Sequence, residues 1–260
     1  MQYLITDLEW EKLHPLLNES SSNTMARLSA QACIYRFSSR LSKSYRTFNW
    51  AMLPSEFYVS GKTAHRYYTK WIKSGSWFKF WDMLIIHRYN MAIPREPDLK
   101  MLETVSPLIG VVLELERAYH YFNHRFLGNT LPSSIRIAVE STQGSKKKLG
   151  YFARRTWHSD NDHGHHIAIC PNSLGNSKNA LEVLLHEMVH AKNATYELED
   201  TDGRTQYHTI DFRDSALLLG LLCTKVEYHG FANTELGERA IDAIAILKPV
   251  EKVFAAMTAY

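Results

Sequence analysis

His186-Glu187-Met188-Val189-His190 combines residue types at a spacing that suits a divalent metal ion. In an α-helix of ~3.6 residues per turn, the two histidines stand one turn apart on one face and can bind a single ion. Glu187 lies beside that face, where its carboxylate can take a proton from water without ligating the metal. This His-Glu-x-x-His pattern is typical of zinc sites in which two imidazoles hold Zn²⁺ and the glutamate is a general base. It predicts a zinc-dependent hydrolase.

The residues around the pattern favour a core helix over a solvated one. Apolar residues recur at helical spacing and predict a helix from about Lys178 to Thr195 with a buried stripe, made by Leu181, Leu184, Leu185, Met188 and Val189. Imidazoles and a carboxylate on a buried helix cost desolvation free energy unless they have a partner. A metal ion is the natural partner.

A catalytic zinc site needs a third protein ligand, and two later histidines are candidates, His208 and His229. A further cluster, His163-Gly164-His165-His166, offers a possible second metal site. Asp160-Asn161-Asp162 directly before this cluster predicts a turn, so we expect a polar loop that leads into a strand. Tyr207 is a candidate for orienting substrate, although a packing role is the simpler interpretation.

Composition describes a globular chain without membrane or disulfide signals. The 260 residues are 45% hydrophobic, enough for a sizeable core. Cys33, Cys170 and Cys223 are odd in number and widely spaced, which supports neither a disulfide framework nor a cysteine zinc knuckle. The sequence contains no signal-peptide pattern and no uncharged apolar run of ~18 residues, so we expect a cytoplasmic protein without a membrane span.

Charge divides the chain into two parts. Residues 1–90 contain twelve lysines and arginines and six acidic residues, a net +6, whereas the remainder has eighteen and twenty-one, a net −3. Prolines at 94 and 97 interrupt the helical pattern between them. We therefore expect a domain over 1–90, a second over 97–236 and a helical tail over 237–260, with any nucleic-acid affinity in the first.

Periodicity and turn signals place the elements. Before the prolines we expect helices only, at about 6–17, 25–39, 48–53, 60–73 and 76–89. After them we expect a helix at 108–126, strands at 135–140, 149–157 and 166–170, the metal helix, a polar loop at 197–207, a helix at 209–219 and two helical patches on either side of Pro249. Lys146-Lys147-Lys148 is interpreted as the solvated turn of a hairpin between the first two strands.

Residues from about Val111 to Leu236 carry a series of recognisable pieces in one order. They are Tyr121-Phe122-Asn123-His124-Arg125-Phe126, Leu131-Pro132, Gly150-Tyr151-Phe152, Trp157, His166-Ile167-Ala168-Ile169, Leu184-Leu185-His186-Glu187-Met188-Val189-His190, Tyr207-His208-Thr209-Ile210-Asp211-Phe212 and Leu219-Gly220-Leu221. This stretch resembles the SprT-like metallopeptidases, the group that includes the Spartan-type DNA–protein-crosslink proteases. The resemblance implies a small zincin-like α+β fold and a zinc ligand set of His186, His190 and His208, since only His208 has Phe212 in the matching place. Many relatives have glycine where this chain has Thr209, which puts the geometry of the loop in question.

Residues from about Leu4 to Leu84 resemble another family, the helical amino-terminal domain of insertion-sequence transposases. The matching residues are Thr6-Asp7-x-x-Trp10, Leu16-Leu17, Ile34-Tyr35-Arg36, Trp50-x-x-Leu53-Pro54, Phe57, Gly61-Lys62-Thr63-Ala64-His65-Arg66-Tyr67-Tyr68, Trp71, Gly75 and Trp77. The resemblance implies an all-α, helix-turn-helix-like DNA-binding domain. Ser60 to Thr63 resembles the start of a recognition helix, on which the candidates for DNA contact are Lys62, Thr63, His65, Arg66 and Lys70. The acidic triad of a transposase is not recognisable, so we expect DNA binding without transposition.

These features predict a zinc metallopeptidase that acts on peptide bonds, with duplex DNA as a partner of its first domain and DNA-bound proteins as possible substrates. The alternative is a non-catalytic DNA-binding accessory protein or regulator of a mobile element with a structural zinc. Glu187 favours the first interpretation, because a purely structural zinc site has no use for a carboxylate beside an open metal position.

Overall fold

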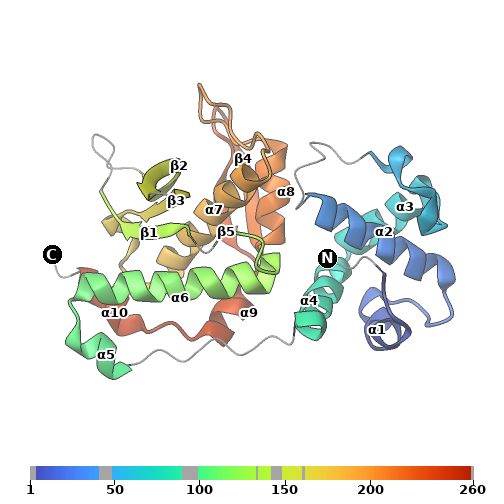
Figure 1. Ribbon diagram of the computed structural model, residues 1–260, viewed down its shortest axis with the longest axis horizontal. Helices are drawn as coiled ribbons and strands as arrows, with labels where there is room; N and C mark the ends of the chain where they lie inside the picture. Colours follow the sequence, from blue (N-terminus) through green and yellow to red (C-terminus); the bar gives the residue numbers. More distant parts are fainter. Residues whose placement is uncertain are drawn as a thin grey trace. The chain divides into compact units, whose positions relative to one another are not determined.

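The computed structural model describes residues 4–40, 49–89, 99–132, 134–141, 148–159 and 162–258. Its contacts divide the chain into two compact units, residues 1–91 and 92–260, each of which is described by itself (Figure 1). The division falls at the edge of the segment that contains Pro94 and Pro97, which lies outside the described residues. The fold is mixed α+β with small sheets.

The described part of the first unit is helical, as the sequence predicts. Its helices are α1 (Asp7–Leu13), η1 (His14–Leu17), α2 (Thr24–Arg40), η2 (Trp50–Met52), η3 (Ser55–Phe57), α3 (Gly61–Lys73) and α4 (Ser76–Tyr89). A capping box begins α1, where the Glu9 amide donates to Thr6 Oγ1 at 3.2 Å and the Thr6 amide donates to the Glu9 carboxylate at 2.8 Å.

Aromatic side chains form much of the core of this unit. The rings of Trp71 on α3 and Trp77 on α4 stack with centroids 6.0 Å apart, and Trp77 stacks in turn on Phe80 at 5.4 Å. Trp71, Trp77, Phe80 and Trp81 are all buried. Burial of such large side chains stabilises a small helical domain through the apolar area removed from water.

The specific helix-turn-helix expectation is not confirmed. Residues 41–60 separate α2 from α3, whereas a helix-turn-helix joins its two helices by a turn of about 3–4 residues. A short turn at Ser74-Gly75 does join α3 to α4, but α4 carries the buried Trp77 and Phe80 and supplies core contacts. On α3 the basic side chains of Lys62, Arg66 and Lys70 are exposed.

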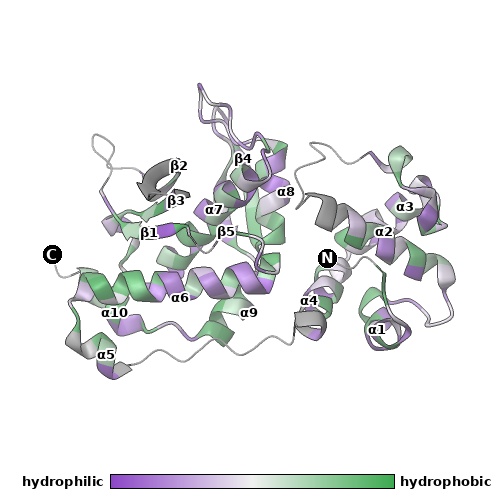
Figure 2. Ribbon diagram, in the orientation of Figure 1, coloured by the Kyte–Doolittle hydropathy of each residue, from purple (hydrophilic) through white to green (hydrophobic). Residues whose placement is uncertain are grey.

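The second unit combines a long helix, two small sheets and the helix of the metal pattern. Its elements are α5 (Leu99–Thr104), α6 (Pro107–Leu127), β1 (Arg136–Val139), β2 (Gly150–Ser159), β3 (Asp162–Ile169), η4 (Pro171–Ser173), α7 (Ser177–Thr195), α8 (Ile210–Leu218), β4 (Leu221–Val226), β5 (Gly230–Leu236), α9 (Glu238–Leu247), α10 (Glu251–Ala255) and η5 (Ala256–Thr258). Figure 2 shows hydrophobic and hydrophilic residues along both α6 and α7. α7 packs against α6, α8 and strands of both sheets, and most of its residues are buried.

The three-stranded sheet has the order β1-β3-β2. β1 is parallel to β3, with Ile137 opposite Ile167, and β2 is antiparallel to β3, with Tyr151 opposite Ala168. The predicted hairpin between the first two strands is therefore wrong, because β1 and β2 lie on opposite sides of β3. As a consequence β2 is an edge strand of this sheet, and Lys148, just before it, is exposed.

One further prediction needs correction in this unit, and one pair of strands was not predicted. β3 begins at Asp162, so residues 163–166 lie within a strand and not in a loop. No sequence pattern predicted the antiparallel hairpin of β4 and β5, which packs against α7 and α8.

The expected carboxy-terminal helices are present on either side of Pro249 and pack on α6 as part of the second unit. The Arg117 guanidinium donates to the carbonyl of Leu247 at 3.0 Å. The Glu251 carboxylate accepts from the backbone amide of Ser177 at 3.2 Å, at the beginning of α7. Contacts of this kind tie the tail to the helix that carries the metal pattern.

Across the part of the chain that the structure describes, no helix is both long and apolar enough to cross a membrane.

Candidate metal centre

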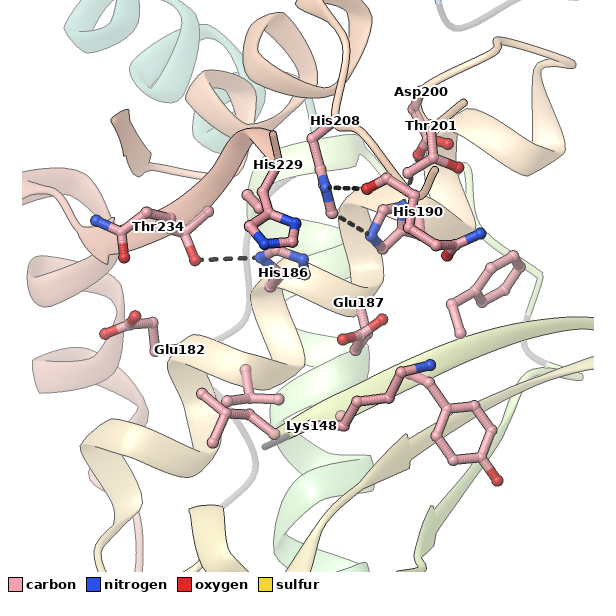
Figure 3. Close-up of a pocket in the computed structure, with 18 of the residues that line it drawn as sticks. Lys148, Glu182, His186, Glu187, His190, Asp200, Thr201, His208, His229 and Thr234 are labelled. Atoms are coloured by element: carbon pink, nitrogen blue, oxygen red, sulfur yellow. Dashed lines mark hydrogen bonds and ion pairs between the residues drawn. The ribbon is translucent and has the colours of Figure 1, made fainter. Parts of the chain in front are cut away.

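Helix α7 positions the metal pattern as predicted. Asn176 caps its beginning by accepting from the Asn179 amide at 2.9 Å. The apolar stripe is fully buried, with Leu181, Leu184, Leu185, Met188 and Val189 each 0% exposed. Since this stripe packs into the core, the opposite side of the helix presents His186 and His190 to a pocket (Figure 3).

The side chain of His208, from the segment before α8, meets those of His186 and His190. The ring centroids of the three histidines lie 5.1–5.3 Å apart. One nitrogen of each ring falls within 4.8 Å of the other two. Within the described residues, this is the only group of three or more His, Cys, Asp or Glu side chains close enough to hold a metal ion.

Buried Phe212 supports all three rings. Its centroid lies 4.8, 4.9 and 4.4 Å from those of His186, His190 and His208. A single apolar ring in contact with three imidazoles restricts their rotation, which favours a preformed site. Phe212, which the sequence analysis paired with His208, thus contacts all three histidines of the group.

Each imidazole has a hydrogen-bond partner on Nδ1. His186 Nδ1 lies 3.2 Å from Thr234 Oγ1, His190 Nδ1 lies 2.8 Å from Asp200 Oδ2, and His208 Nδ1 lies 3.1 Å from the carbonyl of Gln206. A carboxylate and a carbonyl only accept, so the Nδ1 atoms of His190 and His208 carry hydrogens. Partners of this kind fix the tautomer and leave Nε2 free as a metal ligand.

The Nε2 atoms of His190 and His208 face each other at 3.3 Å. Two lone pairs at this distance repel unless a positive charge, a proton or a metal ion, lies between them. Two nitrogens bound to one zinc at about 2.0–2.1 Å in a tetrahedral arrangement are roughly 3.3–3.4 Å apart. The spacing of this pair therefore fits two ligands of one tetrahedral metal ion. All three rings lie close enough to hold a metal ion, whose identity they do not show.

The electrostatics of the three rings differ. Burial and the other two imidazoles lower the pKa of His186 well below its ordinary value, and burial together with His190 lowers the pKa of His208 to about 4. Burial also opposes protonation of His190, but the hydrogen bond and charge of Asp200, with the charge of Glu187, raise its pKa above the ordinary value. Two rings are thus neutral and ready to ligate, and a metal competes with a proton mainly at His190.

Glu187 is buried beside the imidazoles, with 5% of its surface exposed. Burial raises the pKa of this carboxyl group to about 7, and the backbone amide of Phe152 on β2 donates to it. A β-carbon at Gly150 would lie 3.2 Å from Glu187 Oε1 and 2.6 Å from a methyl of Val183, so only glycine leaves room here for the edge strand to pass. These contacts hold a carboxylate that can exchange a proton near neutral pH.

The hairpin of β4 and β5 holds His208 in place. The His208 amide donates to the carbonyl of His229 at 3.0 Å, and the Phe231 amide donates to the carbonyl of His208 at 3.1 Å. Gly230 has φ +64°, and a β-carbon there would lie 2.1 Å from the His208 carbonyl oxygen and 2.8 Å from the Tyr207 ring. The backbone of the hairpin therefore packs directly on the segment that carries the third histidine.

The rival ligand His229 lies on the same pocket but outside the group of three. Its carbonyl serves as the acceptor for His208, so its contribution comes through the backbone. Tyr207 packs near Gly230 and is not among the residues that line the pocket, which agrees with a packing role.

Thr209 has an ordinary φ of −83° and caps α8 by accepting from the Asp211 amide at 3.2 Å. Its hydroxyl donates to the Glu199 carbonyl at 3.0 Å, and its amide donates to the Asp200 carbonyl at 2.9 Å. The glycine expected from the resemblance is therefore not needed here, because threonine joins the loop to the helix.

The pocket has a volume of about 760 Å³, within the range of ligand sites. The amino-terminal half of β2 forms one wall through residues 150, 151, 152 and 154, and α7 and β5 form others. An edge strand can pair with an extended chain through backbone groups on its open side. On β2 the amide of Phe152 is already bonded to Glu187.

The second histidine cluster does not form a comparable site among the described side chains. His166 Nε2 lies 3.3 Å from Glu140 Oε1, and its ring stacks on Tyr151 with centroids 5.9 Å apart. His165 packs against Phe152 at 5.3 Å. These contacts are those of side chains on the faces of a sheet.

The five candidate DNA-contact residues all lie on α3, in the first unit. Lys62, Arg66 and Lys70 are exposed and lie four residues apart, so they form one stripe along the helix. His65 is exposed and stacks on Trp50 at 5.6 Å, whereas Thr63 takes part in the Ser60 cap. Lys70 forms an ion pair with Glu19 at 2.6 Å, so it is less available to a phosphate than its neighbours.

Sequence reasoning missed the residues that orient the imidazoles, chiefly Asp200 and Thr234. Asp200 is one of several acidic residues in the loop after α7, and only its burial, with 5% exposed, distinguishes it. Thr234 belongs to the unpredicted hairpin. No local pattern marks either residue, since each is placed by long-range contacts.

No protein-family model, curated protein or solved structure matches the chain.

Proposed function

We propose that this protein is a zinc-dependent, SprT-like metallopeptidase that hydrolyses peptide bonds. One observation carries the proposal: three imidazoles converge closely enough to hold one metal ion, and the buried carboxylate of Glu187 follows His186 on the same helix. His-Glu-x-x-His with a third histidine is the arrangement of catalytic zinc sites that keep a fourth position open.

The residues of the chain supply the acid–base chemistry. Zinc, when bound, supplies a Lewis acid and lowers the pKa of water bound to it towards ~7. Glu187, whose pKa lies near 7, takes a proton as water attacks the peptide carbonyl and returns it to the leaving amine. The Phe152 amide keeps the carboxylate oriented, and Asp200 holds His190.

The edge strand β2 and the pocket beside it are suited to an extended peptide. Main-chain pairing with such a strand binds substrate largely through backbone groups, which gives broad sequence specificity. We therefore propose an extended or unfolded segment of a protein as the substrate.

We also propose that the first unit binds duplex DNA and directs the peptidase to DNA-bound proteins. Support comes from the net +6 of residues 1–90 and from the exposed stripe of Lys62, Arg66 and Lys70 on α3. Cations on one helix face match the spacing of backbone phosphates and give salt-dependent binding.

The alternative, a non-catalytic accessory protein with a structural zinc, is less well supported. Structural zinc sites are closed by four protein ligands, whereas the described residues bring together three. A structural site would also gain nothing from a buried carboxylate beside its ligands.

Metal analysis joined to a cleavage assay on casein, and on the protein itself, tests the proposal. We expect about one zinc per chain and cleavage that depends on it, measured with and without duplex DNA. A full complement of zinc without cleavage of either substrate under both conditions would favour the accessory protein.

A further inference from the structure

A chain of buried polar side chains runs from the candidate ligand His190 into the interior between α7 and α8. Its members are Asp200, Asn193, Ser215 and Lys192, with exposed fractions of 5%, 0%, 3% and 1%. A lysine is almost never fully buried unless its charge is compensated. The position of Lys192 therefore calls for a physical reason.

The hydrogen bonds connect these groups in sequence. Lys192 Nζ lies 2.9 Å from Ser215 Oγ and 3.2 Å from Asn193 Oδ1, and Ser215 Oγ lies 2.6 Å from the same Asn193 oxygen. Asn193 Nδ2 lies 3.2 Å from Asp200 Oδ2. Asp200 Oδ2 in turn lies 2.8 Å from His190 Nδ1.

The groups at the two ends of this series of hydrogen bonds determine which atoms donate and which accept. An ammonium group only donates, so Lys192 makes Asn193 Oδ1 an acceptor and turns the Asn193 amino group towards Asp200. The carboxylate of Asp200 only accepts, so it takes hydrogens from Asn193 and from His190 Nδ1. The remaining lone pair of His190 is then on Nε2, which faces His208 at 3.3 Å.

Asp200 also joins a second ligand to this chain. Its backbone carbonyl accepts from the amide of Thr209 at 2.9 Å, directly after His208. The neighbouring residue Thr201 forms a bridge with His208. A shift of Asp200 would therefore move the supports of His190 and His208 together.

We propose that Lys192, acting through Ser215 and Asn193, is a positioning residue that orients Asp200 and thereby sets the metal affinity of the site. This inference rests on the proposed metal site, and its measurement is metal affinity. Loss or absence of peptidase activity therefore does not bear on it.

The sign of the effect separates positioning from simple electrostatics. Removing a cation near a bound dication, by itself, strengthens metal binding, because like charges repel. Loss of a group that orients a histidine ligand weakens metal binding, typically by about 10–100-fold. Lys192→Met thus gives opposite results under the two accounts.

The experiment measures dissociation constants for Zn²⁺ and Co²⁺ by competition with a chromophoric chelator, on the full chain. We expect Lys192→Met and Ser215→Ala each to weaken binding by about tenfold, and Asp200→Asn by as much or more. Lys178→Met is the matched control for charge, since Lys178 lies on the same helix and is exposed, and it leaves the affinity unchanged or slightly higher. The visible absorption of the Co²⁺ form should shift in Lys192→Met but not in Lys178→Met, because it reports ligand geometry.

The proposal is overturned if Lys192→Met binds metal as tightly as the wild type or more tightly and its Co²⁺ spectrum is unchanged. This holds even if Asp200→Asn binds metal weakly, because that result concerns Asp200 alone. Circular dichroism of the metal-free variants shows whether they fold. If Lys192→Met does not fold, Ser215→Ala decides, since it removes one hydroxyl, and wild-type affinity in that variant overturns the proposal equally.

Discussion

The candidate metal centre and the candidate DNA surface hold their functional side chains in different ways. His186, His190 and His208 have hydrogen-bond partners on their outer nitrogens and contact one buried phenylalanine. Lys62 and Arg66 extend from an exposed helix. Metal coordination requires fixed geometry, whereas phosphate contacts tolerate flexible side chains. The difference predicts large, position-specific effects in the second unit and small, additive ones in the first.

Glu187→Gln should have the largest effect. Glutamine keeps the shape but cannot accept the proton, so peptidase activity should fall by about 10²–10⁴-fold. Zinc content and circular dichroism should match the wild type. Undiminished cleavage by this variant would exclude Glu187 as the base.

His208→Ala removes one of the three candidate ligands. We expect zinc affinity to fall by more than the roughly 100-fold that follows loss of an outer partner. His229→Ala is the matched control, because its carbonyl remains as the acceptor for the His208 amide. The third-ligand assignment fails if His229→Ala loses the metal and His208→Ala keeps it.

Acidification should release the metal with a defined slope. The pKa of His190 is raised and that of His208 lies at about 4. As the pH falls through the raised pKa of His190, one proton competes with the metal, so affinity should drop about tenfold per pH unit. The slope should steepen near pH 4, where His208 takes a second proton, and a chelator-competition titration over pH measures both. A slope of two log units of affinity per pH unit, which indicates two competing protons, would contradict this order if it were seen near neutral pH.

Basic residues on α3 should show the smallest effects. Arg66→Ala should reduce the slope of log affinity against log salt by about 0.9 if it removes one phosphate contact. Lys70→Ala should reduce it less, because Lys70 is paired with Glu19 at 2.6 Å. Fluorescence anisotropy of a labelled duplex over a salt series gives both slopes, and an unchanged slope in Arg66→Ala would remove this residue from the interface.

Local periodicity explains why α7 could be predicted closely. The expected helix at 178–195 matches Ser177–Thr195, since its apolar stripe, cap and metal pattern agree. The choice of His208 as the third histidine came from the family resemblance. In the structure His208 lies close to His186 and His190. In both cases a short stretch of sequence contains the whole signal.

Long-range pairing explains what could not be predicted. β1 pairs in parallel with β3, although β2 lies between them in the sequence. The residues of neither strand indicate this pairing. The β4 strand has no clean alternation of buried and exposed residues, so nothing marked the hairpin that supplies Thr234. Asp200 and Lys192 gain their contacts only when α7, the following loop and α8 pack together.

Titration of zinc into the metal-free protein during casein cleavage tests whether the three histidines hold a metal that Glu187 needs for hydrolysis. The account predicts activity that rises with zinc and saturates at about one equivalent per chain, with Glu187→Gln binding the same equivalent and remaining inactive. Two results would contradict it: cleavage at the full rate by the metal-free protein, or equal cleavage by the wild type and Glu187→Gln at saturating zinc.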